Sequence, residues 1–281
     1  MLNTITEGIL KWKAARDATR TCRAVTVAIC SRKGGVGKTT ATVHLAVAAA
    51  RWHARRVLVV DMDPQGHVVT SLSSFVRRET ASPLSSVFME KKGDLLDAAI
   101  PTDIPNLWVV PADDRLEQVQ MLLATRIGRE FVLKSVMQKA EDMFDLVLID
   151  CPPNLDTLTL NALVAAHQVV IPTDLSLLGV EGVSDIVEAI ETVRDRLGLP
   201  VLVGGVLVTR VDVRNKAINR ELDRLLEQRF SGLLFNSRVP NNTALPRACL
   251  EGRPVFDFDP GCRGAQGYLD ATDELLDRID A

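Results

Sequence analysis

The chain has 281 residues, of which 47% are hydrophobic and 25% are charged, and its formal net charge is -3. These fractions are ordinary for a folded globular protein, and the length allows one large α/β domain or two small ones. Aromatic residues make up only 4% of the chain, which argues against a reader of single-stranded nucleic acid that stacks bases on aromatic rings. The slightly acidic balance argues against a surface covered in phosphate-binding charge, but it is compatible with a local basic patch.

Residues 1–23 differ in composition from the rest of the chain. They contain five basic residues against two acidic ones, and their apolar positions are spaced for one side of a short helix. We interpret them as a short N-terminal arm or helix that precedes one domain over residues 24–281. A solvated terminal helix and an arm that docks a dimer or touches DNA are both open interpretations.

From residue 24 onward, apolar runs alternate with helical stretches. Continuous Val, Ile and Leu runs are typical of strands covered on both faces, and they occur at Ala24–Cys30, Arg56–Asp61, Leu107–Pro111, Asp145–Asp150, Gln168–Pro172 and Leu202–Thr209. Helices are expected at Lys38–Trp52, Gly128–Asp142, Leu178–Leu197, Lys216–Phe230 and Ala265–Ile279. Such alternation implies parallel pairing through right-handed crossovers. The sequence therefore predicts a single doubly wound α/β domain, with a mostly parallel sheet and helices on both faces.

The segment Cys30–Thr40 follows the first expected strand and opens the first expected helix, which is the context of a phosphate-binding loop. Its glycines allow backbone N–H groups to point at phosphate oxygens, and the helix N-terminus adds partial positive charge. We expect Lys38 to reach the β- and γ-phosphates and Thr39 to bind Mg²⁺. The usual pattern requires glycine at Arg32, and the chain instead has a second lysine, Lys33, before the double glycine. The predicted nucleotide-binding residues here are Lys33, Gly34, Gly35, Val36, Gly37, Lys38, Thr39 and Thr40.

Aspartates at the ends of two expected strands should face this loop. Asp61 ends one strand and is followed by Asp63, and Asp150 ends another. Ligands of open α/β sheets bind at the carboxyl ends of the strands, so we expect Asp150 to hold the Mg²⁺ shell through water. Hydrolysis of a γ-phosphate needs an oriented water more than a strong base. A strand-ending turn with aspartate as a helix cap is the alternative for Asp61 and Asp63.

The segments KGGVGKTT and DMDPQG together resemble the deviant Walker A loop and the following motif of the ParA/MinD superfamily. The segments IDCPPNLDTLTLNAL, Val239–Asn242 and the tail over residues 252–265 resemble ParA partition proteins of the short, Soj-like kind. The resemblance covers roughly Val25 to the end of the chain. Arg32 and Asp174 stand where this family pattern leads us to expect other residues.

The resemblance implies an ATPase with slow intrinsic turnover that uses ATP and Mg²⁺. It implies that Lys33 of each subunit reaches the nucleotide of the other across a homodimer interface and that Asp63 positions the attacking water. The implied catalytic residues are Lys33, Lys38 and Asp63, and the implied metal site is Thr39, Asp61 and Asp150. The ATP-bound homodimer would bind non-specific duplex DNA, and a ParB-like adaptor protein would stimulate hydrolysis and release it. Such a protein is cytoplasmic and nucleoid-associated.

The nucleotide base and the DNA are expected to meet the C-terminal half of the chain. Thr209–Asp212 resembles the motif with which related GTPases read guanine, although a plain loop after a strand is the alternative and the family implies ATP. We place Asp212, Pro240 and Asn241 near the base. Spaced positive charges suffice to contact DNA phosphates without reading sequence, and the candidates for this role are Arg214, Lys216, Arg220 and Arg224. A solvated helix face of mixed charge is the alternative for these residues.

Other cargoes and other functions of the superfamily make different demands on the sequence. A MinD-like positioning ATPase that binds membrane needs a basic amphipathic helix at its C-terminus, whereas residues 269–280 are acidic. We therefore expect no membrane partner, while a protein cluster as cargo stays open. A cluster-carrying ATPase needs paired cysteines, and the five cysteines are scattered without a CxxC pair, as expected for reduced thiols in the cytoplasm. Only about 23 residues precede the first strand, which argues against operator-specific repression.

Overall fold

The computed structural model describes residues 23–77, 81–212, 214 and 216–280. The expected N-terminal arm over residues 1–23 therefore lies outside the described residues, apart from Arg23. The Arg23 side chain lies 3.8 Å from the carboxylates of Glu141 and Asp142.

In the described part of the chain, eight strands form one sheet in the order β3-β4-β2-β5-β1-β6-β7-β8. Neighbouring strands are parallel except β3 and β4, so the predicted mostly parallel sheet is confirmed. The strands are β1 (Val25–Ile29), β2 (Val57–Asp61), β3 (Ile100–Pro101), β4 (Leu107–Val110), β5 (Leu146–Asp150), β6 (Gln168–Thr173), β7 (Leu202–Val211) and β8 (Leu234–Pro240).

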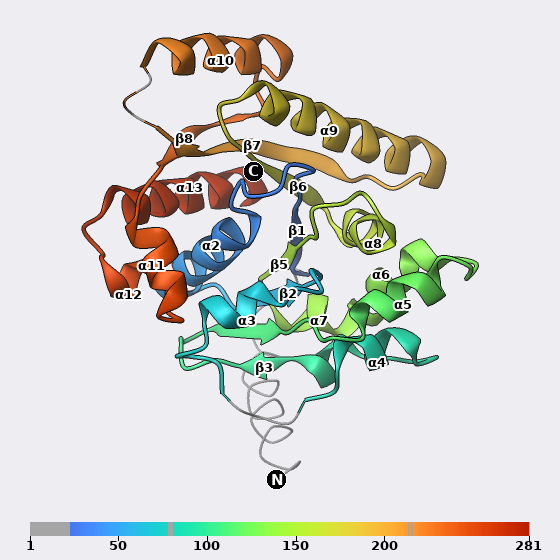
Figure 1. The fold of residues 1–281 in the computed structure, drawn as a ribbon. Helices are drawn as coiled ribbons and strands as arrows, with labels where there is room; N and C mark the ends of the chain where they lie inside the picture. The colour runs from blue at the N-terminus through green and yellow to red at the C-terminus, as the bar shows by residue number, and fades with distance from the viewer. Residues whose placement is uncertain (1–22, 78–80, 213, 215, 281) are drawn as a thin grey trace.

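Helices cover both faces of this sheet (Figure 1), which confirms the predicted doubly wound architecture. One face carries α2 (Lys38–Trp52), α3 (His67–Ser71), α11 (Ala244–Leu250), α12 (Val255–Phe258) and α13 (Arg263–Asp280). The other carries α4 (Leu84–Met89), α5 (Leu116–Leu123), α6 (Val132–Val136), α7 (Gln138–Met143), α8 (Thr157–Ala165), α9 (Leu177–Leu197) and α10 (Lys216–Arg229). None of these described helices has the length and apolar composition needed to cross a bilayer.

The core lies in two layers, one on each side of the central strands. Every residue of β2 and β5 is buried because helices cover both faces of these strands, which accounts for their unbroken apolar sequence. Helix α2 is also buried on nearly all sides, and its alanines at 46 and 48–50 let its backbone lie close to the sheet. This close packing against the sheet fixes the position of α2, the helix that follows the expected phosphate loop.

The expected single helix over Gly128–Asp142 is divided in the structure. It consists of a 3₁₀ turn at Arg129–Phe131 followed by α6 and α7. Asn161 of α8 explains the first break, because its amide accepts a hydrogen bond from the backbone N–H of Leu133 at 3.0 Å and donates one to the carbonyl of Arg129 at 2.8 Å. These contacts replace the bonds that a continuous helix would make there.

Strand β8 was not predicted because its sequence LFNSRVP has polar residues in the middle. The strand lies at the edge of the sheet, where one side lacks a neighbouring strand. The register between β7 and β8 shifts within this stretch, and the carboxylate of Glu274 on α13 accepts the backbone N–H groups of Asn236 and Ser237 at 2.9 Å each. A helix thus supplies the hydrogen-bond acceptor where the regular pairing of the strand is interrupted, and polar residues stand in the middle of the strand at this point.

Candidate functional site

The loop between β1 and α2 has the backbone shape that its glycines predict. Gly35 and Gly37 adopt left-handed conformations with φ of 75° and 85°, which only glycine adopts without strain. Gly37 is the N-cap of α2, so the helix begins with Lys38, Thr39 and Thr40. The unpaired N–H groups of this first helical turn follow the loop directly, as an anion site requires.

The end of β7 holds this loop in place. The Thr209 hydroxyl donates a hydrogen bond to the carbonyl of Val36 at 2.6 Å, and the Arg210 guanidinium donates one to the carbonyl of Gly35. Arg210 adopts φ of 53°, an uncommon value for a residue with a side chain. Sequence reasoning did not find this role, because the carbonyls involved belong to a loop more than 170 positions away.

The structure brings the sequence-predicted residues Thr39, Asp61 and Asp150 together at the carboxyl ends of β2 and β5. Asp61 and Asp150 are paired in register on these strands, and both are fully buried. Asp150 accepts hydrogen bonds from the hydroxyls of Thr39 at 2.6 Å and Thr42 at 3.0 Å. The sequence pointed to Thr39 but not to Thr42, which lies one helical turn further along the same face of α2.

The Asp61 carboxylate mainly organises its own turn. It accepts the backbone N–H groups of Asp63 and Val68 at 3.1 Å each, and Asp63 in turn accepts the N–H of Gln65 at 3.1 Å. These contacts match the capping alternative for both aspartates. The Asp63 side chain nevertheless lies at the same strand end, with 9% of the residue exposed.

Burial raises the pKa values of the two strand-end carboxylates. The pKa of Asp150 rises to about 7, although hydrogen bonds from Thr39 and Thr42 oppose the shift. The pKa of Asp61 is raised by burial first and by the nearby charge of Asp150 second. Two buried carboxylates and a threonine hydroxyl form an oxygen donor set that suits Mg²⁺, which usually binds one or two carboxylates together with substrate phosphates. The site thus fits a divalent cation chemically.

Lys33 lies within its own subunit and contacts the start of α9. Its ammonium lies 2.6 and 2.7 Å from the two carboxylate oxygens of Asp174 and 2.8 Å from the hydroxyl of Ser176. Arg32 likewise pairs with Asp185 of α9 at 2.7 Å. These two ion pairs give a structural reason for Arg32 and Asp174, the residues that departed from the family pattern.

The expected base-reading residues Asp212, Pro240 and Asn241 lie at the carboxyl ends of β7 and β8. Asn241 donates its backbone N–H to the carbonyl of Val211 at 2.9 Å, and Pro240 pairs with Val211 at the end of β8. The Asp212 carboxylate is engaged by the Arg214 guanidinium at 2.8 and 2.9 Å, and these hydrogen bonds lower the pKa of Asp212 to about 2. The expected contacts of Asp212 with a base and of Arg214 with DNA must therefore compete with this ion pair.

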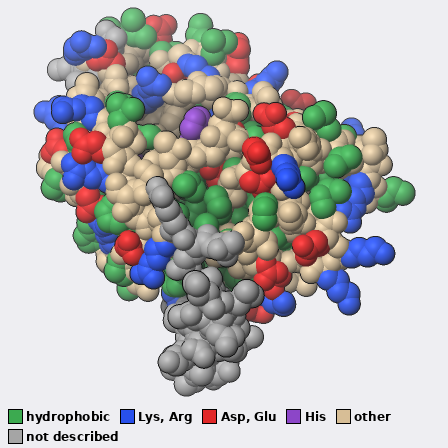
Figure 2. Space-filling model, turned by 60° about the horizontal axis from the view of Figure 1, so that its bottom comes forward, with side chains coloured by type: hydrophobic (Ala, Val, Ile, Leu, Met, Phe, Trp, Pro, Cys, Tyr) green, Lys and Arg blue, Asp and Glu red, His purple; other side chains and the backbone are tan. Residues whose placement is uncertain are grey.

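The other candidate DNA-binding residues lie on α10. Arg220 and Arg224 are exposed one turn apart, whereas the side chain of Lys216 lies outside the described residues. The opposite side of α10 contributes the buried Leu226 to the core. On the face of the molecule in Figure 2, positive and negative side chains are interspersed and do not form one basic surface.

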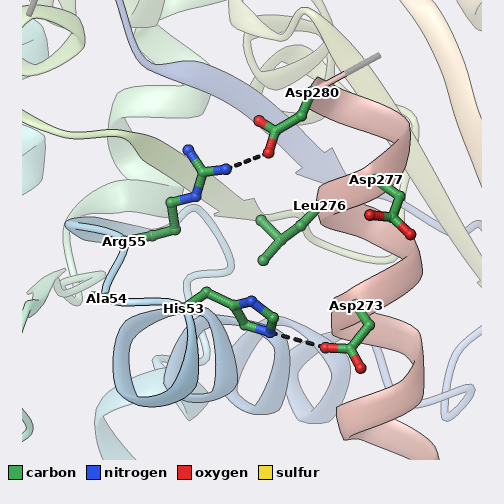
Figure 3. A pocket seen from close by; sticks show the side chains of 7 residues that line it. All are labelled: His53, Ala54, Arg55, Asp273, Leu276, Asp277 and Asp280. Atoms are coloured by element: carbon green, nitrogen blue, oxygen red, sulfur yellow. Dashed lines mark hydrogen bonds and ion pairs between the residues drawn. The ribbon is translucent and has the colours of Figure 1, made fainter.

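A separate pocket lies far from this strand end, between the end of α2 and the last turns of α13 (Figure 3). Its walls hold a 2.9 Å contact between the His53 ring and the Asp273 carboxylate and an ion pair between Arg55 and Asp280. Helix α2 has 15 residues and so spans about 22 Å between the phosphate loop and this pocket. We interpret the pocket as a surface cleft between paired charges and place the functional site at the loop.

The comparisons with known proteins cover almost the whole chain. Residues 24–200 match the family model described as AAA domain. The sporulation initiation inhibitor protein Soj of Bacillus subtilis is 33% identical over 249 residues, which cover 89% of this chain and 97% of that protein. The chromosome partitioning protein ParA of Caulobacter vibrioides is 34% identical over 254 residues, covering 90% of this chain and 94% of that protein.

Solved structures share the same fold. Cobyrinic acid a,c-diamide synthase of Mycobacterium smegmatis, solved with ADP and magnesium, has a TM-score of 0.75 at 28% identity, covering 92% of this chain and 96% of that one. The cell division ATPase MinD of Pyrococcus furiosus has a TM-score of 0.70 at 23% identity, covering 90% and 99%, which speaks for the fold alone. Since the family model matches residues 24–200, and Soj and ParA are 33% and 34% identical over 89% and 90% of this chain, the chain belongs to the ParA/MinD-type family of P-loop ATPases.

Proposed function

We propose that this protein is a DNA partition ATPase that hydrolyses ATP with Mg²⁺ and binds DNA as an ATP-bound dimer. The observation that carries the proposal is the buried Asp150 carboxylate, which accepts the Thr39 hydroxyl at 2.6 Å beneath a glycine-rich loop. The relatives named as chromosome partitioning proteins support the biological role.

The nucleotide would bind across the loop and the first turn of α2. Backbone N–H groups of residues 34–40 would receive the phosphates, and the Lys38 side chain would lie against the β- and γ-phosphates. Thr39 would bind Mg²⁺ directly, and Asp61 and Asp150 would hold its hydration shell. When bound, the cation neutralises charge that develops on the phosphates. The ADP- and magnesium-bound synthase of M. smegmatis supports both ligands.

Hydrolysis would depend on position more than on strong bases. Asp63 follows the end of β2 and is 9% exposed, and its carboxylate would accept a hydrogen bond from the attacking water. Lys33 would leave Asp174 and contact the phosphates bound by the partner subunit. We expect slow intrinsic turnover, because a switch is useful only when its ATP-bound state lasts.

DNA would bind the exposed arginines of α10. Arg220 and Arg224 share one helical face of α10, and α10 follows β7, the strand that holds the phosphate loop through Thr209. A dimer would present this short basic stretch twice. Phosphate contacts of this kind carry no sequence information and make binding depend on salt.

The experiment is co-sedimentation of the protein with plain duplex DNA in ATP and in ADP, at two salt concentrations. We expect retention only with ATP and weaker retention at the higher salt. Replacing Arg220 and Arg224 with glutamate should abolish retention and leave nucleotide binding intact. The matched control replaces Arg194 and Arg196 with glutamate. These two arginines are also exposed, but they lie in the last turn of α9 and not on α10. Equal retention with ADP would contradict the switch.

A MinD-like positioning ATPase for another cargo is the second candidate within the family. Its membrane form is disfavoured by α13, whose apolar residues Ala271, Leu275 and Leu276 are already buried against the core. Its outer residues include Asp270, Asp273 and Asp277, which anionic lipid would repel. Dimerisation with ATP but without DNA retention would favour a protein cluster as the cargo.

A further inference from the structure

We propose that Asp174 is a positioning residue that holds Lys33 inside its own subunit, so that opening this ion pair precedes the contact of Lys33 with a partner's nucleotide. The inference rests on the dimer described under the proposed function. Asp174 departs from the family pattern, and the geometry assigns its carboxylate to holding Lys33.

The network around Lys33 is fully satisfied within one subunit. The ammonium contacts both oxygens of Asp174 and the hydroxyl of Ser176. The Ser176 hydroxyl donates to Asp174 at 2.7 Å, and its oxygen also accepts the backbone N–H of Gly179 at 2.9 Å. One donor hydrogen and two lone pairs are thus all used. The ammonium is therefore tied to the N-terminus of α9 as well as to one carboxylate.

The backbone of α9 is shaped to bring these groups together. A Cβ atom on Gly179 would lie 2.8 Å from the carboxylate of Asp174, and it would also collide with the backbone carbonyl of that residue. Gly182 faces Lys33, because a Cβ atom there would lie 3.7 Å from the Cβ and the backbone nitrogen of Lys33. Gly179 therefore leaves the room that Asp174 needs, and Gly182 lies beside Lys33 at ordinary contact distance.

The ion pair competes with the intersubunit role of the lysine. The side chains of Lys33 and Asp174 are 25% and 28% exposed, so the pair is shielded from solvent more than a typical surface pair. One ammonium cannot contact Asp174 in this way and a phosphate of the partner subunit at the same time. Any free energy that stabilises the pair therefore opposes dimer formation, and the dimer must open two such pairs.

Arg32 and Asp185 provide a matched control next to this pair. Arg32 precedes Lys33 in the loop, and Asp185 lies further along α9, at 2.7 Å from the guanidinium. Their side chains are 60% and 33% exposed. Asp185→Asn thus removes a loop-to-α9 ion pair of the same kind without touching Lys33.

The first experiment measures the chemical reactivity of the Lys33 amine in nucleotide-free protein, by limited reductive methylation and mass spectrometry. Asp174→Asn should raise the labelling rate of Lys33 by about threefold or more, because the amine spends more time in solvent. Asp174→Glu should restore part of the protection, and Asp185→Asn should leave the rate unchanged. A thermal melt of each variant checks that the fold is intact. Equal labelling in wild type and Asp174→Asn would overturn the proposal.

The second experiment measures ATP-dependent dimerisation by sedimentation velocity. Asp174→Asn should dimerise at about a tenfold lower protein concentration than wild type, because each of the two subunits gains about threefold when its ion pair is removed. Asp185→Asn should dimerise at the same concentration as wild type. Dimerisation of Asp174→Asn at a higher concentration than wild type would overturn the proposal. If wild type stays monomeric with ATP while the labelling changes as expected, the proposed dimer fails and the placement of Lys33 by Asp174 stands.

Discussion

The Thr39 hydroxyl donates a hydrogen bond of 2.6 Å to Asp150, and this contact joins the first turn of α2 to the end of β5. The two residues are 111 positions apart in the sequence. Asp150 is fully buried, and burial raises its pKa to about 7. The buried Asp150 carboxylate, which a bound cation would need, therefore destabilises the folded protein when no cation is bound.

Asp150→Asn should stabilise the nucleotide-free protein and abolish stabilisation by Mg²⁺ and ATP. A carboxyl whose pKa is raised by folding contributes stability below its unfolded pKa of 3.8 and loses it as the pH rises through about 7. The melting temperature of the variant should therefore exceed that of wild type by about 2–5 °C at pH 8, and by less at pH 6. Thermal melts with and without Mg²⁺ and ATP check this, with the exposed Asp270→Asn as control. A variant less stable than wild type at pH 8 would contradict it.

Thr209→Val should loosen the phosphate loop. The substitution keeps the shape of the side chain and removes the hydroxyl that donates to Val36 at 2.6 Å, which leaves a buried carbonyl without this partner. We expect a loss of about 1–2 kcal/mol in the free energy of unfolding and a several-fold rise in KM for ATP. Urea unfolding and steady-state kinetics measure the two effects.

Thr26→Val is the matched control for that substitution. Thr26 is also fully buried, but its hydroxyl has no hydrogen-bond partner among the described residues. The same chemical change should therefore be neutral or stabilising here. Equal destabilisation by both substitutions would show that the Thr209 hydroxyl has no special role in holding the loop.

Glu274→Ala should destabilise the edge of the sheet at β8. Its carboxylate accepts the N–H groups of Asn236 and Ser237, the hydroxyl of Ser237 and the guanidinium of Arg278, all at 2.9 Å. Removing the carboxylate should cost about 2–3 kcal/mol, because two backbone donors lose a charged acceptor. Asp277→Ala, on the exposed side of α13, should change the free energy of unfolding by less than about 0.5 kcal/mol. Similar losses in both variants would rule out the edge contact as the cause.

His44→Gln should flatten the pH dependence of stability below pH 6.5. Burial lowers the pKa of His44 to about 4, and the neutral ring accepts the N–H of Val255 at 3.0 Å. Between pH 6.5, the ordinary pKa of histidine, and pH 4, the unfolded chain binds the His44 proton more readily than the folded protein does. The free energy of unfolding of wild type therefore decreases as the pH falls, by up to roughly 3 kcal/mol. Urea unfolding at pH 7, 5.5 and 4.5 tests this against the exposed His67→Gln. An unchanged slope in His44→Gln would contradict the prediction.

Much of the architecture follows from local patterns in the sequence. Helix α2 spans Lys38–Trp52 as predicted, and the six predicted strands agree with β1, β2, β4, β5, β6 and β7 to within two residues at each end. These strands are covered on both faces, so their apolar runs contain no ambiguous alternation. Short helices such as α3 and α12 were missed because four or five residues carry too little periodicity to be recognised.

The sequence by itself determined the phosphate loop and the aspartates at the strand ends, because glycine and aspartate are required there by backbone geometry and by charge. Only the tertiary structure decided which partners these groups meet. It placed Thr209 against Val36, Glu274 along β8 and Asp174 against Lys33, three contacts between segments far apart in the chain. Side-chain hydrogen bonds and ion pairs depend on distances that the fold sets, and a linear pattern of residue types does not contain those distances.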